Sequence, residues 1–299
     1  MADTLIAAVP RPGRSGRDRW ERASMLAPAV LALAAVTLFP AVYLLWMSVR
    51  GLQVQAPRGF VGLENFRVLV QSPSFREATG NTVVFVASTT TVSLILGLAL
   101  ALALNEDLRG RGVMRTLLTL PLVVPPVVAG FAWKFLLSSD VGVIGAYLFR
   151  LLGVGWAPLG DPALAMVSVV LADIWSKTSF MFLILLAGLQ AIPSELYEAA
   201  RIDGAGFLVQ LRQITLPLLR GVLVVALILR VLDAINTFDV IFVMTQGGPG
   251  TATQTLTILG WKTGFTYFDL GQAAALAVLM MVATVMAAMA LIRRTARAA

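Results

Sequence analysis

The chain has no cysteine and no histidine among its 299 residues, and only 13% of its residues are charged. Without cysteine there can be no disulfide and no thiol nucleophile, and without either residue there can be no zinc site built on them. The charged share is well below the ~25% that is typical of soluble domains. The phosphate-binding signature G-x-x-x-x-G-K-[ST] is also missing, so the chain does not bind ATP in that way.

Apolar residues dominate instead, at 58% of the chain. They gather in runs that are long enough to cross a bilayer, which takes about 20 residues per helix. The pattern predicts an all-α integral membrane protein with six transmembrane helices, at residues 25–49, 81–104, 116–137, 163–191, 222–244 and 272–292. Pro121, Pro125 and Pro126 exclude a regular helix at the start of the third run.

The basic residues predict how the chain is oriented. The net charge is +7, and the arginines cluster beside the apolar runs, which fits membrane orientation and lipid contact better than nucleic-acid binding. An N-terminus in the cytoplasm places 14 Lys and Arg residues on that side and 6 on the other. Both termini are therefore predicted to be cytoplasmic. The resulting segments are a basic tail (1–24), a first helix with its periplasmic connection (25–80), a helical core (81–292) and a second basic tail (293–299).

The longest polar interruption in the second half of the chain is the segment 192–221, on the cytoplasmic side. Ser194 can cap a short helix that carries acids in its first turn, and Gly204 can end that helix in a tight turn. A second amphipathic piece follows, and Leu216 and Pro217 are expected to break it before the next apolar run. The small-faced helix suits docking into a groove on a partner, although an ordinary helical loop has the same pattern.

One motif in this segment has a specific spacing. Glu198-Ala199-Ala200 is followed after three residues by Gly204, and then, nine residues further, by Ile214-x-Leu216-Pro217. This pattern resembles the EAA loop of permease subunits of binding-protein-dependent ABC importers, in the carbohydrate branch of the maltose and trehalose type. The resemblance implies a type I (MetI-like) permease bundle over 81–292, whose loop 192–221 couples to the ATPase through Glu198, Ala199, Ala200, Asp203 and Gly204.

The resemblance also implies the setting of the chain. It would be a multi-pass subunit of the bacterial inner membrane, forming half of a pathway for a di- or oligosaccharide such as trehalose or maltose. The expected partners are a second permease subunit, two ATP-binding cassette ATPases and an extracytoplasmic solute-binding protein. The chain itself would be no enzyme and would bind no cofactor or metal, since ATP and magnesium would be held by the ATPases.

Charged and polar side chains inside the predicted spans are costly and therefore point to a cavity or to the bundle interior. The fourth run carries Asp173, Trp175 and Lys177, of which the two ions can pair along one helix. The fifth run carries Arg230, Asp233, Asn236, Thr237 and Asp239. These residues can line a translocation path, or they can simply hold helices together. Arg230 leaves open an ion pair with Asp233 or Asp173, or an anionic substrate.

The main alternative is an ion-coupled secondary transporter of a small polar solute. Such a transporter is built from inverted repeats and discontinuous helices. No internal repeat is visible in the sequence, and the EAA-like loop has no role in that mechanism. A membrane enzyme would need paired carboxylates, a metal set or a nucleophile with its base, and the acids here are scattered.

Overall fold

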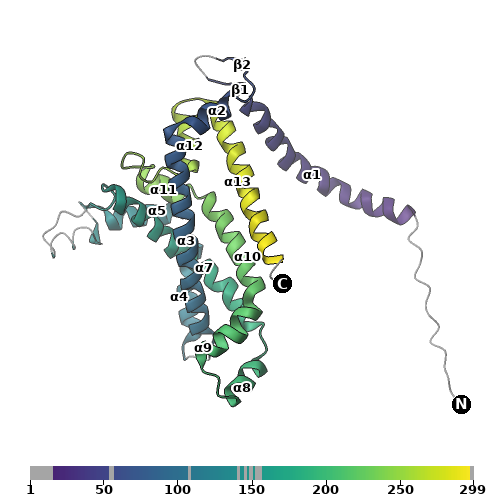
Figure 1. The fold of residues 1–299 in the computed structure, drawn as a ribbon, viewed down its shortest axis with the longest axis vertical. Helices are drawn as coiled ribbons and strands as arrows, with labels where there is room; N and C mark the ends of the chain where they lie inside the picture. The colour runs from purple at the N-terminus through teal and green to yellow at the C-terminus, as the bar shows by residue number, and fades with distance from the viewer. Residues whose placement is uncertain are drawn as a thin grey trace.

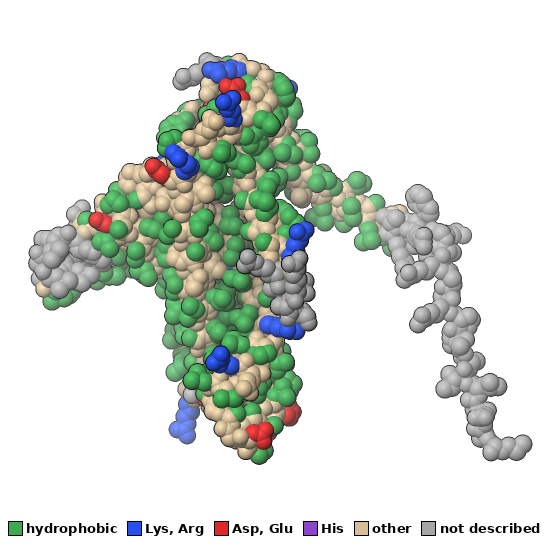
Figure 2. Space-filling view, viewed as in Figure 1, with side chains coloured by type: hydrophobic (Ala, Val, Ile, Leu, Met, Phe, Trp, Pro, Cys, Tyr) green, Lys and Arg blue, Asp and Glu red, His purple; other side chains and the backbone are tan. Residues whose placement is uncertain are grey.

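The computed structural model describes residues 16–53, 57–106, 109–139, 142–144, 147, 151 and 157–296, with side chains from 24 to 293 within those ranges. Most of these residues are helical and form an elongated bundle (Figure 1). Apolar side chains cover much of one face along its length (Figure 2). Of the predicted tails, residues 1–15 and 297–299 lie outside the described residues, whereas 16–24 and 293–296 are helical.

The long helices are α1 (Gly16–Ser48), α3 (Pro73–Asn105), α7 (Pro162–Gln190), α10 (Leu216–Ile235) and α13 (Leu270–Ala296). Shorter helices are α2 (Glu64–Gln71), α4 (Arg111–Val123), α5 (Pro126–Leu137), α8 (Ser194–Ile202), α9 (Phe207–Gln210), α11 (Asp239–Thr245) and α12 (Leu256–Trp261). The strands β1 (Arg50–Gly51) and β2 (Gly59–Phe60) pair antiparallel at one end of the bundle, and α8 lies at the opposite end (Figure 1).

Within the described part of the chain, four helices are long and apolar enough to cross a membrane, over Ser24–Ser48, Pro73–Asn105, Pro162–Gln190 and Leu270–Arg293. The pair of α4 and α5 passes the same test only as a broken span, because the two helices meet at 98°. α10 is long enough but carries Arg220, Arg230 and Asp233. The all-α membrane fold is thus confirmed, while the count of six spans remains a prediction.

The bend between α4 and α5 lies where the consecutive prolines predicted an irregularity. Val124 and Pro125 each precede a proline and adopt extended conformations, with ψ of 122° and 138°. A residue before proline avoids the helical region because the proline ring clashes with it, so two prolines in a row force two extended residues. The third span, predicted as one segment over 116–137, is therefore two helices.

The fifth span, predicted as continuous over 222–244, is also broken. α10 ends at Ile235 and α11 begins at Asp239. Asn236 Nδ2 donates to the Leu232 carbonyl at 2.8 Å, and Thr237 Oγ1 donates to the Asp233 carbonyl at 3.1 Å. Short polar side chains here donate to the last carbonyls of α10, and the Asn236 N–H turns back to the Asp233 carbonyl at 3.2 Å, so the helix can stop.

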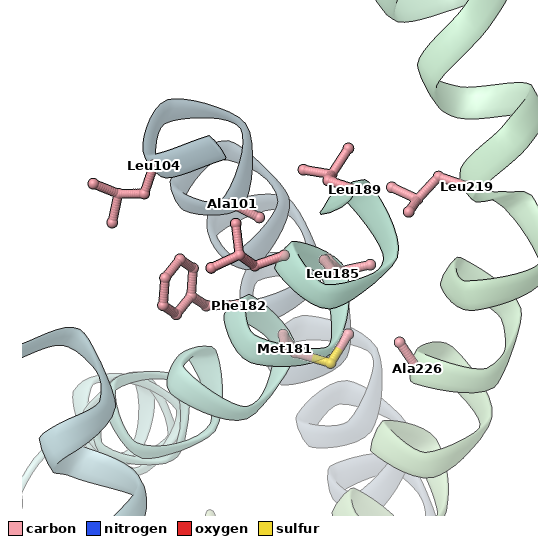
Figure 3. Packing of buried hydrophobic residues seen from close by; sticks show 9 residues of the cluster. Ala101, Leu104, Met181, Phe182, Leu185, Leu189, Leu219 and Ala226 are labelled. Atoms are coloured by element: carbon pink, nitrogen blue, oxygen red, sulfur yellow. The ribbon is translucent and has the colours of Figure 1, made fainter. Parts of the chain in front are cut away.

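The packed core joins α3, α7 and α10 (Figure 3). Phe182, Leu185 and Leu189 of α7 are buried against Ala101 of α3 and Leu219 of α10. Small residues let the backbones approach closely, which is how helices associate in lipid. At Gly97, an added Cβ would lie 2.6 Å from the Met181 Cβ, so α3 and α7 can pack in this way only around a glycine.

Candidate functional site

A cavity of about 410 Å³ opens at the break between α10 and α11, against α7 and the first residue of α5. The residues that line it are Pro126, Asp173, Ser176, Lys177, Leu232, Asp233, Asn236, Thr237, Phe238, Asp239 and Val240. Six of the eight polar or aromatic residues predicted from the fourth and fifth runs are therefore in its wall. The break in the helix explains this, because it turns residues 236–239 toward α7.

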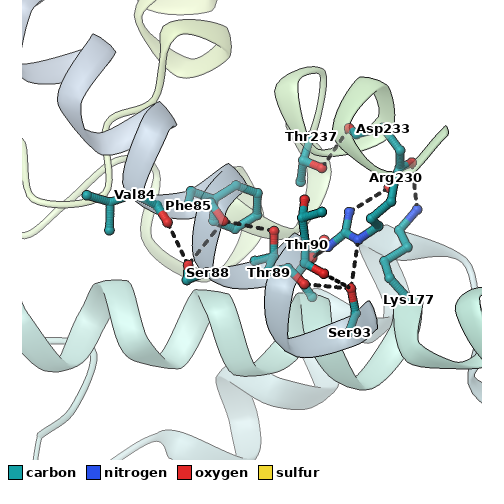
Figure 4. Close-up of polar contacts among 11 residues, drawn as sticks. Val84, Phe85, Ser88, Thr89, Thr90, Ser93, Lys177, Arg230, Asp233 and Thr237 are labelled. Atoms are coloured by element: carbon teal, nitrogen blue, oxygen red, sulfur yellow. Dashed lines mark hydrogen bonds and ion pairs between the residues drawn. The ribbon is translucent and has the colours of Figure 1, made fainter. Parts of the chain in front are cut away.

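Arg230 lies beside this cavity rather than in its wall, and its side chain is completely buried. Its Nη2 donates to Asp173 Oδ2, its Nη1 donates to Asp233 Oδ2 at 2.9 Å, and its Nε donates to Ser93 Oγ at 3.2 Å. The guanidinium thus joins α3, α7 and α10 (Figure 4). A buried cation is tolerated only with such partners. Of the possibilities that the sequence left open for Arg230, the structure shows the ion pair, and with both acids rather than one.

The spacing suggested that Lys177 and Asp173 pair with each other along α7, but they do not. Lys177 Nζ lies 2.9 Å from Asp233 Oδ1 on α10 (Figure 4), and Asp173 is taken by Arg230. The burial of Arg230 decides between the two arrangements, because a guanidinium out of contact with water needs a carboxylate on each accessible edge. Asp233 consequently bridges two cations, and its side chain is 40% exposed.

Two acceptors in the cavity remain available to a ligand. A third, Asp173 Oδ1, has no hydrogen-bond partner in the described chain, but it is buried out of a ligand's reach. The carboxylate of Asp239 is exposed and makes no hydrogen bond or ion pair with any described residue. Asn236 uses only its amide nitrogen, so its carbonyl oxygen is also available. The wall can therefore accept hydrogen bonds from a ligand that carries several donors.

Trp175 does not reach the cavity. It is 41% exposed on another face of α7, and its ring meets the ring of Trp133 edge-on with centroids 6.3 Å apart. Conversely, sequence reasoning missed Ser93 and Ser176. Ser93 belongs to a group with Thr89 and Thr90 in an otherwise apolar run, and those hydroxyls were a signal that one face of α3 meets a polar neighbour.

The second candidate region is the predicted coupling segment. α8 is a separate short helix with no buried residue, and Ile202 and Leu196 are 87% and 43% exposed. It ends as predicted at Gly204, whose φ of +80° is readily available only to glycine. Ser194 does not cap it, because the helix already begins at Ser194, after Pro193, and no side chain caps its first turn.

Pro217 of the EAA-like motif was expected to break the helix, but it does not. Helix continues from Phe207 into α10 through a π-helical turn, η1 (Leu211–Thr215). The N–H of Leu216 donates to Leu211, five residues back, so the turn before Pro217 is wider than an α-helical turn. Because proline has no N–H and its ring crowds the preceding turn, this widening lets the helix pass through Pro217.

One side-chain contact connects α8 with this turn. The Tyr197 and Thr215 hydroxyls are 3.0 Å apart, and Gln210 Nε2 donates to the Ala205 carbonyl at 2.7 Å. Between these groups and the ends of α3 and α7 lies an open cavity of about 600 Å³. α8 therefore projects from the bundle and is braced on one side only.

At the other end of the bundle, the segment between α11 and α13 packs around a lysine. Lys262 Nζ donates to Gln254 Oε1 at 2.9 Å, and burial lowers the pKa of Lys262 below its ordinary value. Phe242, Trp261 and Phe265 form a row of ring contacts beside it. This end also carries Gln53 and Asp269, which hydrogen-bond at 2.8 Å across the sequence.

Comparisons with known proteins agree with this architecture. Residues 93–298 match the family described as the binding-protein-dependent transport system inner membrane component. The chain is 41% identical over 251 residues to the trehalose/maltose transport system permease protein MalF of Thermococcus litoralis, with 83% of each chain covered. It is 35% identical over 279 residues to the trehalose transport system permease protein SugA of Mycobacterium tuberculosis, covering 93% of this chain and 89% of that one.

The fold is shared with a solved structure as well. A chain of a bacterial ABC transporter involved in the import of the acidic polysaccharide alginate superposes with a TM-score of 0.83 at 22% identity, covering 94% of this chain and 96% of that one. The protein belongs to the family of binding-protein-dependent transport system inner membrane components. It is a multi-pass inner-membrane permease subunit of an ABC importer and not an enzyme. Its broken helices therefore do not make it a secondary transporter.

Proposed function

We propose that the chain forms half of the membrane pathway of an ATP-driven importer for a di- or oligosaccharide such as trehalose or maltose. The related permeases named for trehalose and maltose support a sugar substrate. The observation that carries the proposal is the cavity at the α10–α11 break, which gathers carboxylate, amide and hydroxyl groups around a volume of about 410 Å³. Such groups suit sugar hydroxyls, which both donate and accept hydrogen bonds.

The position of this cavity suits alternating access. Its wall is built by α7, α10 and α11, and the break at residues 236–238 is a place where the chain can bend with few backbone hydrogen bonds to lose. In this proposal the substrate contacts Asp233, Asn236, Thr237 and Asp239, while Arg230 and Asp173 hold the helices that carry them. Trp175 lies outside the cavity and contacts no sugar there.

The exposed helix α8 is the proposed contact with an ATPase subunit. Glu198, Ala199 and Ala200 lie on a helix without buried residues, at one end of the bundle (Figure 1), and Asp203 and Gly204 end it. ATP-driven closure of two ATPases would move α8, and the continuous helix from Phe207 to Ile235 would carry that motion to the cavity. ATP and magnesium would then be bound by the ATPases.

This arrangement implies six crossings, with α4–α5 and α10–α11 each acting as one interrupted span, and both termini in the cytoplasm. It also implies a second permease, because a single bundle of this kind encloses only half of a pathway. A solute-binding protein would deliver the sugar at the end that carries β1, β2 and α12. The basic residues near the opposite end support this orientation.

The test is purification of the tagged chain in mild detergent, followed by mass spectrometry and by reconstitution of what copurifies into liposomes. We expect an ATPase and a second permease to copurify, and ATP-dependent uptake of trehalose or maltose once the solute-binding protein is added. Asp233→Ala should reduce uptake, whereas Leu31→Ala, at an exposed position of α1 away from the cavity, should not. Recovery of the chain alone as a homodimer would contradict the proposal.

A further inference from the structure

The charge of the transported sugar is a question that the relatives leave open. Two are named for trehalose or maltose, while a chain of the same fold belongs to an importer of an acidic polysaccharide. The cavity at the α10–α11 break contains charges of both signs, so its selectivity depends on which of them are free to meet a ligand. The positions of Lys177 and Asp233 show which charges a ligand can meet.

Neither cation at the cavity presents an uncompensated charge to an anion. Arg230 is completely buried, and its Nε, Nη1 and Nη2 all donate to groups of the protein. Lys177 is 24% exposed and lines the cavity, but its Nζ lies 2.9 Å from Asp233 Oδ1. The bound carboxylate of Asp233 occupies the place where a substrate carboxylate or phosphate would bind Lys177.

The acceptors, in contrast, are in excess. Asp173, Asp233 and Asp239 bring three carboxylates to the wall, against Lys177 and the adjacent Arg230. Asp173 Oδ1 is buried without a partner, and the Asp239 carboxylate has none among the described residues. A site with one carboxylate more than its cations repels an anion, while hydroxyl groups can donate to the exposed carboxylate of Asp239.

We propose that Asp233 makes this cavity selective for uncharged over anionic sugars, because it neutralises Lys177. The inference rests on the proposed role of the cavity as the sugar site. An anion that bound Lys177 would have to displace Asp233 or lie beside the carboxylates of Asp233 and Asp239, and both arrangements bring like charges together. An uncharged sugar donates to Asp239 and to the Asn236 carbonyl oxygen and leaves the Lys177–Asp233 pair intact.

The proposal predicts a gain of anion binding rather than only a loss of function. Asp233→Asn keeps the side-chain shape and removes the charge, so it releases Lys177. In the complete importer, purified with its partner subunits and without the solute-binding protein, we would measure equilibrium binding of maltose and of maltobionate, its anionic oxidation product. The preference for maltose should fall by up to about fivefold in Asp233→Asn, the scale of one partly exposed ion pair.

Two further variants identify the cause. In the double variant Asp233→Asn with Lys177→Gln the gain of maltobionate binding should disappear, because no free cation remains. Asp239→Asn is the matched control, since it removes the same charge from the same cavity but releases no cation, and it should give a clearly smaller gain. Should Asp233→Asn disturb assembly of the importer, Asp233→Ser provides a second neutral substitution with the same expectation.

The outcomes separate this inference from the proposed function. Unchanged preference in both neutral variants of Asp233, or a gain that persists without Lys177, would overturn the assignment of Asp233 as the selectivity residue even if the importer transports maltose. A gain of maltobionate binding that requires Lys177 supports it even if the natural sugar is neither maltose nor trehalose. Tight maltobionate binding by the unaltered importer would also overturn it.

Discussion

The hydroxyl groups of Tyr197 on α8 and Thr215 in the π-helical turn lie 3.0 Å apart. Thr215 is buried and also donates to the Gln210 carbonyl at 3.3 Å, so the contact ties α8 to the base of α10. No residue of α8 is buried, and an open cavity separates part of it from the bundle. This hydrogen bond therefore positions the proposed ATPase contact relative to the helix that lines the sugar cavity.

Tyr197→Phe should weaken coupling more than it weakens the fold. Loss of one such hydrogen bond costs about 1 kcal/mol, which a bundle of this size tolerates. We expect less sugar transported per ATP hydrolysed in the reconstituted importer, with little change in melting temperature. Thr215→Val should have the same effect, and combining it with Tyr197→Phe should cause no further loss. Thr215→Ser keeps the hydroxyl group and should keep the coupling of the unaltered importer. Equal transport per ATP in Tyr197→Phe and in the unaltered importer would show that the Tyr197–Thr215 hydrogen bond has no role in coupling.

Reversing the charge at Glu198 should disrupt the proposed contact with the ATPase. Glu198→Lys places a cation on the exposed surface of α8, and it should uncouple or dissociate the ATPases while the bundle still inserts in the membrane. Copurification of the ATPases and sugar-stimulated ATP hydrolysis are the measurements. Glu64→Lys, at the other end of the bundle, is the control for copurification of the ATPases. Normal stimulated hydrolysis in Glu198→Lys would show that α8 is no coupling helix.

We predict that Arg230 stabilises the fold and does not contact the substrate. Arg230→Met leaves Asp173 buried without its partner, and breaking a buried ion pair in this way typically costs about 3–5 kcal/mol. The variant should lower the melting temperature of the purified importer and its yield. Adding Asp173→Asn should recover part of the loss, since the buried charge is then removed. If Arg230→Met melts like the unaltered importer and only sugar binding is lost, Arg230 is a substrate ligand.

The glycines of α3 provide a matched test of helix packing. At Gly97 a methyl group would lie 2.6 Å from the Met181 Cβ and 3.0 Å from the Phe182 nitrogen, whereas nothing lies within 4 Å of a methyl group at Gly80. Gly97→Ala should therefore destabilise the importer by about 1–3 kcal/mol through overpacking. Gly80→Ala should stabilise α3 by up to about 1 kcal/mol. Thermal melting of the two variants compares them directly, and equal shifts would contradict this account of packing between α3 and α7.

Much of the site could be predicted from residue types, while the pairing of those residues could not. Asp173, Lys177, Asp233, Asn236 and Asp239 were identified because polar groups in apolar runs are costly, and the cavity contains all five. The i, i+4 spacing suggested that Lys177 meets Asp173, and it meets Asp233 instead. Ion pairs between helices depend on how the helices face each other, which local spacing does not encode.

Some breaks in the helices could also be predicted from the sequence, and others could not. Pro125 and Pro126 interrupt the third apolar run because of steric contacts within the chain, and this was expected from the sequence. The stop at Asn236 was not expected, because asparagine and threonine are tolerated in helices and cap them only where the tertiary structure lets the chain turn. Pro217 gave the opposite error, since a wider π-helical turn accommodates it.

The sequence by itself determined that this is a helical membrane protein, where its apolar segments lie, and, through the EAA-like motif, its family. Those properties follow from hydropathy and from the spacing of residues along one segment, both of which are local. The tertiary structure alone decided that Arg230 is buried inside the bundle, that Asp233 pairs with Lys177, and that Trp175 faces away from the cavity. Those properties depend on side chains from α3, α7 and α10 meeting in space, which only the packing of the helices settles.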